Sequence, residues 1–316
     1  MQFYTPEPMS VLSRWTSRIA LFSLLLVVTA AFLHRLFGMP TPVALTLVQT
    51  ALLGAAVSLV LGVLATVGIW RTGRAGAARV LLGIVLSLGL ISVPVAVFLV
   101  ARGQPSINDV TTDLSNPPEF VELAKVRVGG ANPAVYPTER FSKSQAATFP
   151  DLAPLYIDRS LNETYELVRE AARRMDFKFV REKPPGEGAG EPGYIEAFDR
   201  TLVLGFYDDI SIRVSGDEAS SRVDLRSASR YGEIDFGANA DRLRAFMKEI
   251  VVRLEETVPA ADGDTKGGKK ANIKDAQKPG KEGDQKLVRP PRKIQNPARS
   301  DAQRGPERKV RPPAPE

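Results

Sequence analysis

The chain of 316 residues contains no cysteine and only one histidine, His34. These absences exclude disulfide frameworks, cysteine nucleophiles, Cys/His zinc sites and Ser-His-Asp triads from everything that follows the first hundred residues. The sequence also lacks a P-loop, a dinucleotide fingerprint, a nucleophile elbow and an aspartate spacing of the EF-hand type. We therefore expect no cofactor and no metal site, which leaves carboxylates, arginines and hydroxyl groups as the candidate functional side chains.

Acidic residues are almost missing from residues 1–102, which hold seven Arg, no Lys and one acid, Glu7. Residues 103–258 hold 20 basic and 27 acidic residues, and residues 259–316 hold 15 basic and eight acidic residues. The middle region is thus acidic, and the excess positive charge lies at the two ends of the chain. A nucleic-acid-binding domain would concentrate Lys and Arg on its folded face, so we expect no nucleic-acid partner.

Charges are missing from three long apolar runs, which predict membrane-spanning helices at about 15–37, 43–70 and 80–101. About 20 apolar residues suffice to cross the hydrocarbon core of a bilayer, so the lipid bilayer is the expected partner of this section. The first run is the shortest. A signal peptide cleaved after Ala31 is therefore the alternative interpretation of that run.

The arginine distribution predicts the orientation of these helices. Five of the seven arginines of the section flank the helices on one side, where they are Arg14, Arg18, Arg71, Arg74 and Arg79. Because cytoplasmic loops carry the excess of Lys and Arg, we expect a cytoplasmic N-terminus and an exported, periplasmic domain on a bacterial inner membrane. No Asp, Glu or Lys lies inside a span, which argues against a transporter.

Gly54, Ser58 and Gly62 recur every four residues on the second span. Small residues at that spacing let two helix backbones approach closely. We expect the stripe to pack against the third span, near Gly83 and Ser87, in preference to a second copy of the chain.

The acidic region alternates helical and strand-like patterns. Ser160 and Glu163 form a capping box at the start of a helix, and a second helix is expected at about 239–257. Strand-like segments lie at 177–182, 194–200, 209–214 and 222–227. The last two alternate apolar and polar residues, which is typical of a sheet with one covered face. The predicted fold is an α+β domain over residues 103–258. It has an antiparallel sheet of about four strands, two helices packed on one face, and an extended lead-in over residues 103–150.

The last segment, residues 259–316, contains nine Pro, many Lys and Arg, and few bulky apolar residues. Such a composition cannot bury enough surface to fold, so we expect a disordered tail. The tail either is simply solvated or acts as a polycation that reaches anionic lipids or polymers of the cell envelope.

Several motifs of the acidic region resemble one family. They are Ile107–Asp113, Phe149–Leu155, Ile195–Ala197, Gly205–Ile210, Asp224–Arg230, Asp235–Asn239 and Arg242–Phe246. Together they resemble the bacterial domain-of-unknown-function 1499 family over roughly residues 105–255. The resemblance implies a domain identity. It implies no activity, because the family has none that can be transferred.

The densest polar cluster spans a strand end, a loop and a helix start. It consists of Asp208, Asp209, Asp224, Arg226, Ser227, Ser229, Arg230, Tyr231, Asp235 and Asn239. Three interpretations remain open. The groups form structural ion pairs and helix caps; or a ligand or anion binds to Arg226, Ser229, Arg230, Tyr231 and Asn239; or Asp208, Asp209 and Asp235 perform acid–base catalysis.

Three functional hypotheses follow. The first is a binding or structural module of the bacterial envelope with protein partners that the sequence does not identify. The second is a membrane-tethered hydrolase that uses Asp208, Asp209 and Asp235, which requires these carboxylates to converge on an open pocket. The third is a lipid-binding module, which requires an apolar cavity between sheet and helices. Glu196 lies in a strand beside apolar residues, and the sequence leaves open which way it points.

Overall fold

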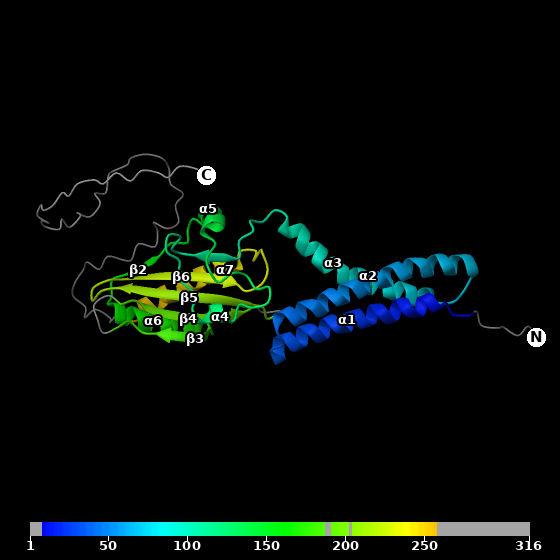
Figure 1. The fold of residues 1–316 in the computed structure, drawn as a ribbon, viewed down its shortest axis with the longest axis horizontal. Helices are drawn as coiled ribbons and strands as arrows, with labels where there is room; N and C mark the ends of the chain where they lie inside the picture. The colour runs from blue at the N-terminus through cyan, green and yellow to red at the C-terminus, as the bar shows by residue number, and fades with distance from the viewer. Residues whose placement is uncertain (1–7, 187–190, 202–203, 258–316) are drawn as a thin grey trace, which may run out of the picture. The chain divides into compact units, whose positions relative to one another are not determined.

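The computed structural model describes residues 8–186, 191–201 and 204–257. Three long helices come first, and an antiparallel sheet with helices follows (Figure 1). The tail that we expect to be disordered, residues 259–316, lies outside the described residues.

The first three helices are each long and apolar enough to cross a membrane, which confirms the three expected segments. They are α1 (Val11–Phe37), α2 (Thr41–Thr72) and α3 (Ala77–Ala101). Their buried residues are nearly all small, and many follow one another at intervals of three and four. On α1 and α2 they include Ser13, Thr16, Ala20, Ser23, Ala44, Ala51, Ala55, Ser58, Gly62 and Ala65. This alternation is the spacing of helices that pack along a left-handed seam.

The stripe of small residues on α2 packs within the chain, but its main partner is α1. Ser58 donates a hydrogen bond to the carbonyl oxygen of Thr16 on α1 over 2.9 Å. A Cβ atom on Gly54 would overlap the Ser23 hydroxyl of α1, and one on Gly62 would meet Ile84 of α3 at 2.7 Å. The expectation that the third span is the partner is therefore corrected. The reason is that α1 also carries small residues along one face, so Gly54 and Ser58 contact α1, and Gly62 contacts both α1 and α3.

The described strands form one antiparallel sheet, in which five follow the order β1-β6-β5-β4-β3 and β2 pairs with β6. Figure 1 shows β6, β5, β4 and β3 side by side. The four expected strands are present as β3 (Lys178–Lys183), β4 (Gly193–Arg200), β5 (Tyr207–Gly216) and β6 (Ser221–Ser229). Two strands of three residues, β1 (Asp109–Thr111) and β2 (Leu155–Ile157), pair with opposite ends of β6. A three-residue strand is too short to show an alternating pattern, so sequence inspection missed both.

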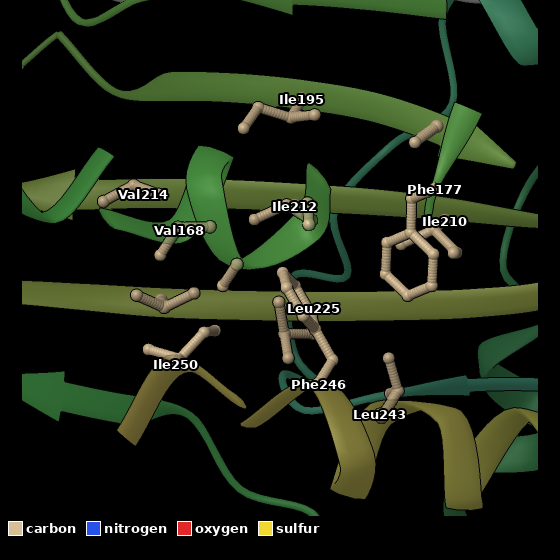
Figure 2. Packing of buried hydrophobic residues seen from close by; sticks show 14 of the residues in the cluster. Val168, Phe177, Ile195, Ile210, Ile212, Val214, Leu225, Leu243, Phe246 and Ile250 are labelled. Atoms are coloured by element: carbon tan, nitrogen blue, oxygen red, sulfur yellow. The ribbon is translucent and has the colours of Figure 1, made fainter. Parts of the chain in front are cut away.

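One face of the sheet packs against α6 (Leu161–Arg174) and α7 (Ala238–Glu256), as expected. The capping box is confirmed at the start of α6, because the Ser160 hydroxyl accepts a hydrogen bond from the Glu163 amide at 3.3 Å. Figure 2 shows Phe177 and Phe246 packed over the apolar side of the strands, with ring centroids 5.3 Å apart. Fully buried core residues include Val168, Ile195, Ile210, Ile212, Val214, Leu225, Leu243 and Ile250.

The lead-in covers the other face, which the sequence suggested would be open. It is not simply extended, since it contains β1, α4 (Glu122–Lys125) and α5 (Thr138–Thr148). Residues 112–136, which we call the strap, cross the polar side of β4, β5 and β6. As a result several polar residues of these strands are buried nearly as deeply as the apolar ones. Asp224 and Arg226 are each 1% exposed.

Candidate functional site

The candidate site is the polar face of the sheet together with the strap above it. Glu196 of β4, Ser211 of β5 and Arg226 of β6 are neighbours in register across this face. Each is 1% exposed. A buried polar group costs free energy unless it is hydrogen-bonded, so the partners of these side chains determine what the face can do.

Ser211 and Arg226 bind the backbone of the strap. The Ser211 hydroxyl donates to the carbonyl oxygen of Glu119 over 2.8 Å. Arg226 donates to the carbonyl oxygens of Pro118 at 3.2 Å and Ala134 at 2.8 Å. Two segments of the strap, which are separated in sequence, are thus held by one guanidinium group.

Arg226 also forms a buried ion pair with Asp109 of β1. The two hydrogen bonds of this pair measure 3.0 and 2.7 Å, and the guanidinium lies 4.4 Å from the centroid of the Phe120 ring. Burial raises the pKa of the Asp109 carboxyl, while the hydrogen bond and the charge of Arg226 oppose that rise. These four hydrogen bonds and the aromatic contact hold the Arg226 side chain within the folded domain. It offers no open anion site.

Asp208 and Asp209 lie on opposite faces of β5, because successive side chains of a strand point to opposite sides. Asp208 pairs with Arg242 of α7 at 2.6 Å on the helix side. Asp209 lies on the strap side, where it pairs with Arg127 at 2.9 Å and Arg230 at 2.7 Å. Both carboxylates are almost fully buried. They therefore do not converge on a common substrate position.

Asp235 caps the start of α7. Its carboxylate accepts hydrogen bonds from the amides of Gly237 and Asn239, both at 2.9 Å. Carboxylates stabilise the positive end of a helix in this way. The three aspartates named as catalytic candidates thus occupy three separate environments in the described part of the chain.

The remaining ligand candidates bond to one another or to nearby backbone. Asn239 donates to the Ser229 hydroxyl at 2.9 Å and to the Asn108 carbonyl oxygen at 3.1 Å. It also accepts from the Ser227 hydroxyl at 2.7 Å. The Tyr231 hydroxyl donates to the Val128 carbonyl oxygen at 3.2 Å. The structure links Asn239 to Ser227 and Ser229 and bonds Tyr231 to the strap, so the polar groups of these residues are already in use.

Glu196 points toward the strap and not into the apolar core. Its carboxylate accepts three backbone N–H groups at the start of α4, from Val121 at 3.0 Å, Glu122 at 3.2 Å and Leu123 at 2.9 Å. It also accepts a hydrogen bond from Arg181 of β3 at 3.2 Å. Charge-assisted bonds of this kind are among the stronger hydrogen bonds in proteins, so Glu196 anchors the centre of the strap.

A cleft of about 330 Å³ opens between the strap and the β3–β4 edge of the sheet. It is lined by Asn116, Pro117, Glu119, Val121, Arg181, Lys183, Tyr194, Glu196 and Arg213. The side chains of Arg181 and Lys183 are 30% and 49% exposed, so both are accessible to solvent. Arg213 is 12% exposed and is held by Asp224 at 2.8 Å and Asp113 at 3.0 Å.

Sequence inspection did not single out Arg181 and Lys183. The alternation of β3 is broken by an irregularity between Phe179 and Arg181, where the pairing with β4 shifts. A bulge of this kind changes which residues share a face. Arg181 and Lys183 lie two positions apart after the shift. This spacing of two basic residues was the feature of the sequence that could have indicated the cleft.

The profile of the family described as "Protein of unknown function (DUF1499)" matches residues 109–250, which confirms the resemblance inferred from the motifs. No curated protein matches the chain. Among solved structures, the chain is similar to TTHA0849 from Thermus thermophilus, with 13% sequence identity and a TM-score of 0.18. That match covers 34% of this chain and 97% of the other. A TM-score this low supports no inference about fold or function.

Proposed function

We propose that this protein is a membrane-anchored binding module of the bacterial envelope, and that its domain binds a small anionic ligand in the cleft between strap and sheet. The observation that best supports this proposal is that two basic residues, Arg181 and Lys183, line that cleft. Within the described residues Arg181 donates one side-chain hydrogen bond, to Glu196, and Lys183 has one carboxylate neighbour, Glu191 at 3.8 Å, while both basic side chains line the cleft. A guanidinium and an ammonium side by side bind phosphate or carboxylate groups.

The geometry of the aspartates favours this binding module over the hydrolase. Asp208, Asp209 and Asp235 each have an arginine or a helix start as partner, and they belong to different faces or loops. A carboxylate that is hydrogen-bonded to a buried arginine or to the amides of a helix start is blocked by its partner, so it is badly placed to exchange a proton with a substrate. The third hypothesis, a lipid site between sheet and helices, is disfavoured because apolar side chains fill that layer (Figure 2).

The ligand can be tested on the full-length protein in detergent, with inorganic phosphate and citrate as probes at constant ionic strength. We expect saturable thermal stabilisation by at least one probe, because binding to the folded state alone raises its stability. The double variant Arg181→Gln/Lys183→Gln should lose this effect.

The matched control is Lys178→Gln/Lys248→Gln, which removes the same charge from exposed positions outside the cleft. It should keep the stabilisation of the unchanged protein. Equal loss in both double variants, or no saturable effect with either probe, would refute the cleft as an anion site.

The membrane orientation is a second part of the proposal. The arginine-rich end of the helices supports a cytoplasmic N-terminus and an exported domain. An alkaline phosphatase fused after Ser106 should be active, whereas fluorescence from a reporter that folds only in the cytoplasm would reverse the topology.

We also propose that the basic tail, residues 259–316, reaches anionic lipids or polymers of the envelope. Its 15 basic and eight acidic residues support a salt-sensitive attraction. Removing the tail should lower binding of the detergent-free protein to anionic liposomes at low salt, and unchanged binding would contradict this role.

A further inference from the structure

Five arginines gather at one end of the three-helix bundle, which we call the arginine end. Arg14 and Arg18 lie in the first turns of α1, and the others lie around the connection from α2 to α3, at Arg71, Arg74 and Arg79. The Ser10 amide donates to the Ala75 carbonyl oxygen over 3.0 Å, so the start of α1 is tied to that connection. The five cations therefore belong to one surface region.

These cations have no carboxylate partner in the described part of the membrane section. The only acid among residues 1–102 is Glu7, which precedes the described residues. The one side-chain acceptor that the structure gives them is the Met9 sulfur, which lies 2.6 Å from Arg79 and carries no charge. A cluster of arginines at a membrane surface without acidic neighbours is complementary to anionic lipid head groups.

An apolar crevice of about 430 Å³ lies between α2 and α3 beside the arginine end. It is lined mainly by Ile69, Trp70, Ala77, Val80, Leu81 and Ile84. Trp70 directly precedes Arg71, and its side chain is strongly exposed. Tryptophan favours the level of the lipid head groups, which places the mouth of the crevice there.

We infer that this crevice binds one anionic phospholipid, with an acyl chain between α2 and α3 and its phosphate held by Arg71, Arg74 and Arg79. The crevice wall is apolar and matches a hydrocarbon chain, while Arg71 lies in the last turn of α2, Arg74 on the connection and Arg79 in the first turn of α3. Arginine binds phosphate through paired N–H groups, so the head group is held by directed bonds as well as by charge. This site is separate from the cleft of the domain and does not depend on the function proposed for it.

Native mass spectrometry of the full-length protein tests the inference, with phosphatidylglycerol and phosphatidylcholine of identical acyl chains as the probes. The unchanged protein should bind phosphatidylglycerol more tightly than phosphatidylcholine. Arg74→Gln/Arg79→Gln should weaken phosphatidylglycerol binding roughly 10- to 30-fold, which corresponds to two arginines at a membrane surface. Three arginines remain at that end, so the charge bias that sets the topology is kept.

A second variant tests the crevice without changing charge. Ala77→Phe places a ring where the acyl chain is expected and should reduce binding of both lipids, with all five arginines in place. The charge-matched control is Lys178→Gln/Lys248→Gln, which removes two positive charges from exposed positions of the domain and should leave lipid binding by the bundle unchanged.

Loss in Arg74→Gln/Arg79→Gln and in Ala77→Phe, together with retention in Lys178→Gln/Lys248→Gln, supports a defined site. Loss of equal size in Lys178→Gln/Lys248→Gln, or full binding by Ala77→Phe, overturns it in favour of diffuse attraction between charges. Thermal unfolding of each variant in detergent identifies a misfolded sample. If one of the two test variants is misfolded, lipid binding by the other test variant decides whether the site exists.

Discussion

The arginines of the membrane section and those of the domain have opposite surroundings. On the polar face of the sheet, Arg226 pairs with Asp109, Arg127 and Arg230 share Asp209, and Arg213 binds Asp224. In the described membrane section, none of the arginines at the arginine end has a carboxylate neighbour. The same side chain therefore holds the fold together in one region. In the other it remains available to groups outside the chain.

The difference follows from the cost of removing charge from water. A buried arginine in the domain is tolerated because an aspartate and several carbonyl oxygens satisfy it within the protein. An arginine at a bilayer surface can reach water and lipid phosphates, so it needs no partner from the chain. Four sets of variants test this contrast, from the largest expected effect to the smallest.

Breaking the buried pair of the domain should have the largest effect. Arg226→Met leaves the Asp109 carboxylate buried without its cation, and we expect a loss of about 3–5 kcal/mol in the free energy of unfolding. Chemical denaturation, followed by a spectroscopic signal from the domain, measures this loss. The double variant Asp109→Leu/Arg226→Met should recover much of the loss, and Arg222→Met, on the same strand but more exposed, should cost far less. Equal effects of the Arg226 and Arg222 variants would contradict a special role for the buried pair.

The membrane section should depend on close packing and not on charge. Gly83→Leu on α3 introduces a Cβ atom that would lie 2.5 Å from the Thr16 side chain of α1. Overpacking of this kind costs roughly 1–3 kcal/mol, measurable by unfolding in detergent–SDS mixtures. Gly89 lies on the same helix, and a Cβ atom there would meet no other atom within 4 Å, so Gly89→Leu is the control and should be nearly neutral. A neutral Gly83→Leu variant would show that α1 does not pack where the structure places it.

The acid response of the domain should include Asp113 of the strap. Although burial opposes ionisation, the amides of Asn116 and Ser115 and the charges of Arg222 and Arg213 hold the pKa of Asp113 below its usual value. Because the folded pKa is depressed, the stabilisation is present above the unfolded pKa of about 4 and is lost as the pH falls through the folded value. Asp113→Asn should cost about 1 kcal/mol at pH 7 and less at pH 3. A cost that is the same at both pH values would exclude the charge as its cause.

Neutralising a membrane arginine should have the smallest effect on stability. Arg18→Gln removes a cation with no carboxylate partner in the described residues, so the free energy of unfolding should change by less than about 0.5 kcal/mol. Unfolding in detergent–SDS mixtures measures it beside Arg230→Gln, which leaves Asp209 with only Arg127 and should be clearly destabilised. A large loss for Arg18→Gln would mean that this arginine also has a partner within the protein.

Much of the architecture could be predicted from local patterns. The apolar runs gave the three membrane helices, the capping box gave the start of α6, and the alternation of β5 and β6 gave their pairing and their core face. The short strands β1 and β2 could not be predicted, because three residues carry no period. The role of the lead-in was also hidden, since it binds the polar face largely through backbone groups, and its few apolar residues follow no helical or strand-like repeat.

The candidate site shows the same limit in its chemistry. Sequence inspection placed Arg226, Arg230 and Asn239 in one cluster, whereas the structure pairs Arg226 and Arg230 with carboxylates on the strap side of the sheet and bonds Asn239 to Ser227 and Ser229. It could not assign the partners, since Asp109 lies 117 positions before Arg226 and Arg127 lies 82 positions before Asp209. The direction of Glu196 was likewise undecided until the strap placed three amides over it.

The sequence by itself determined that this protein has three helices long and apolar enough to span a membrane and an α+β domain, because hydrophobic runs and periodicity act over neighbouring residues. Tertiary structure alone decided which polar residues are hydrogen-bonded or ion-paired within the protein and which remain accessible to solvent. The strap, folded back over the sheet, turned an apparently exposed polar face into a buried ion-pair network and left a basic cleft at its edge. The physical reason is that the neighbours of a charged group decide whether it is paired or accessible, and those neighbours come from segments far apart along the chain.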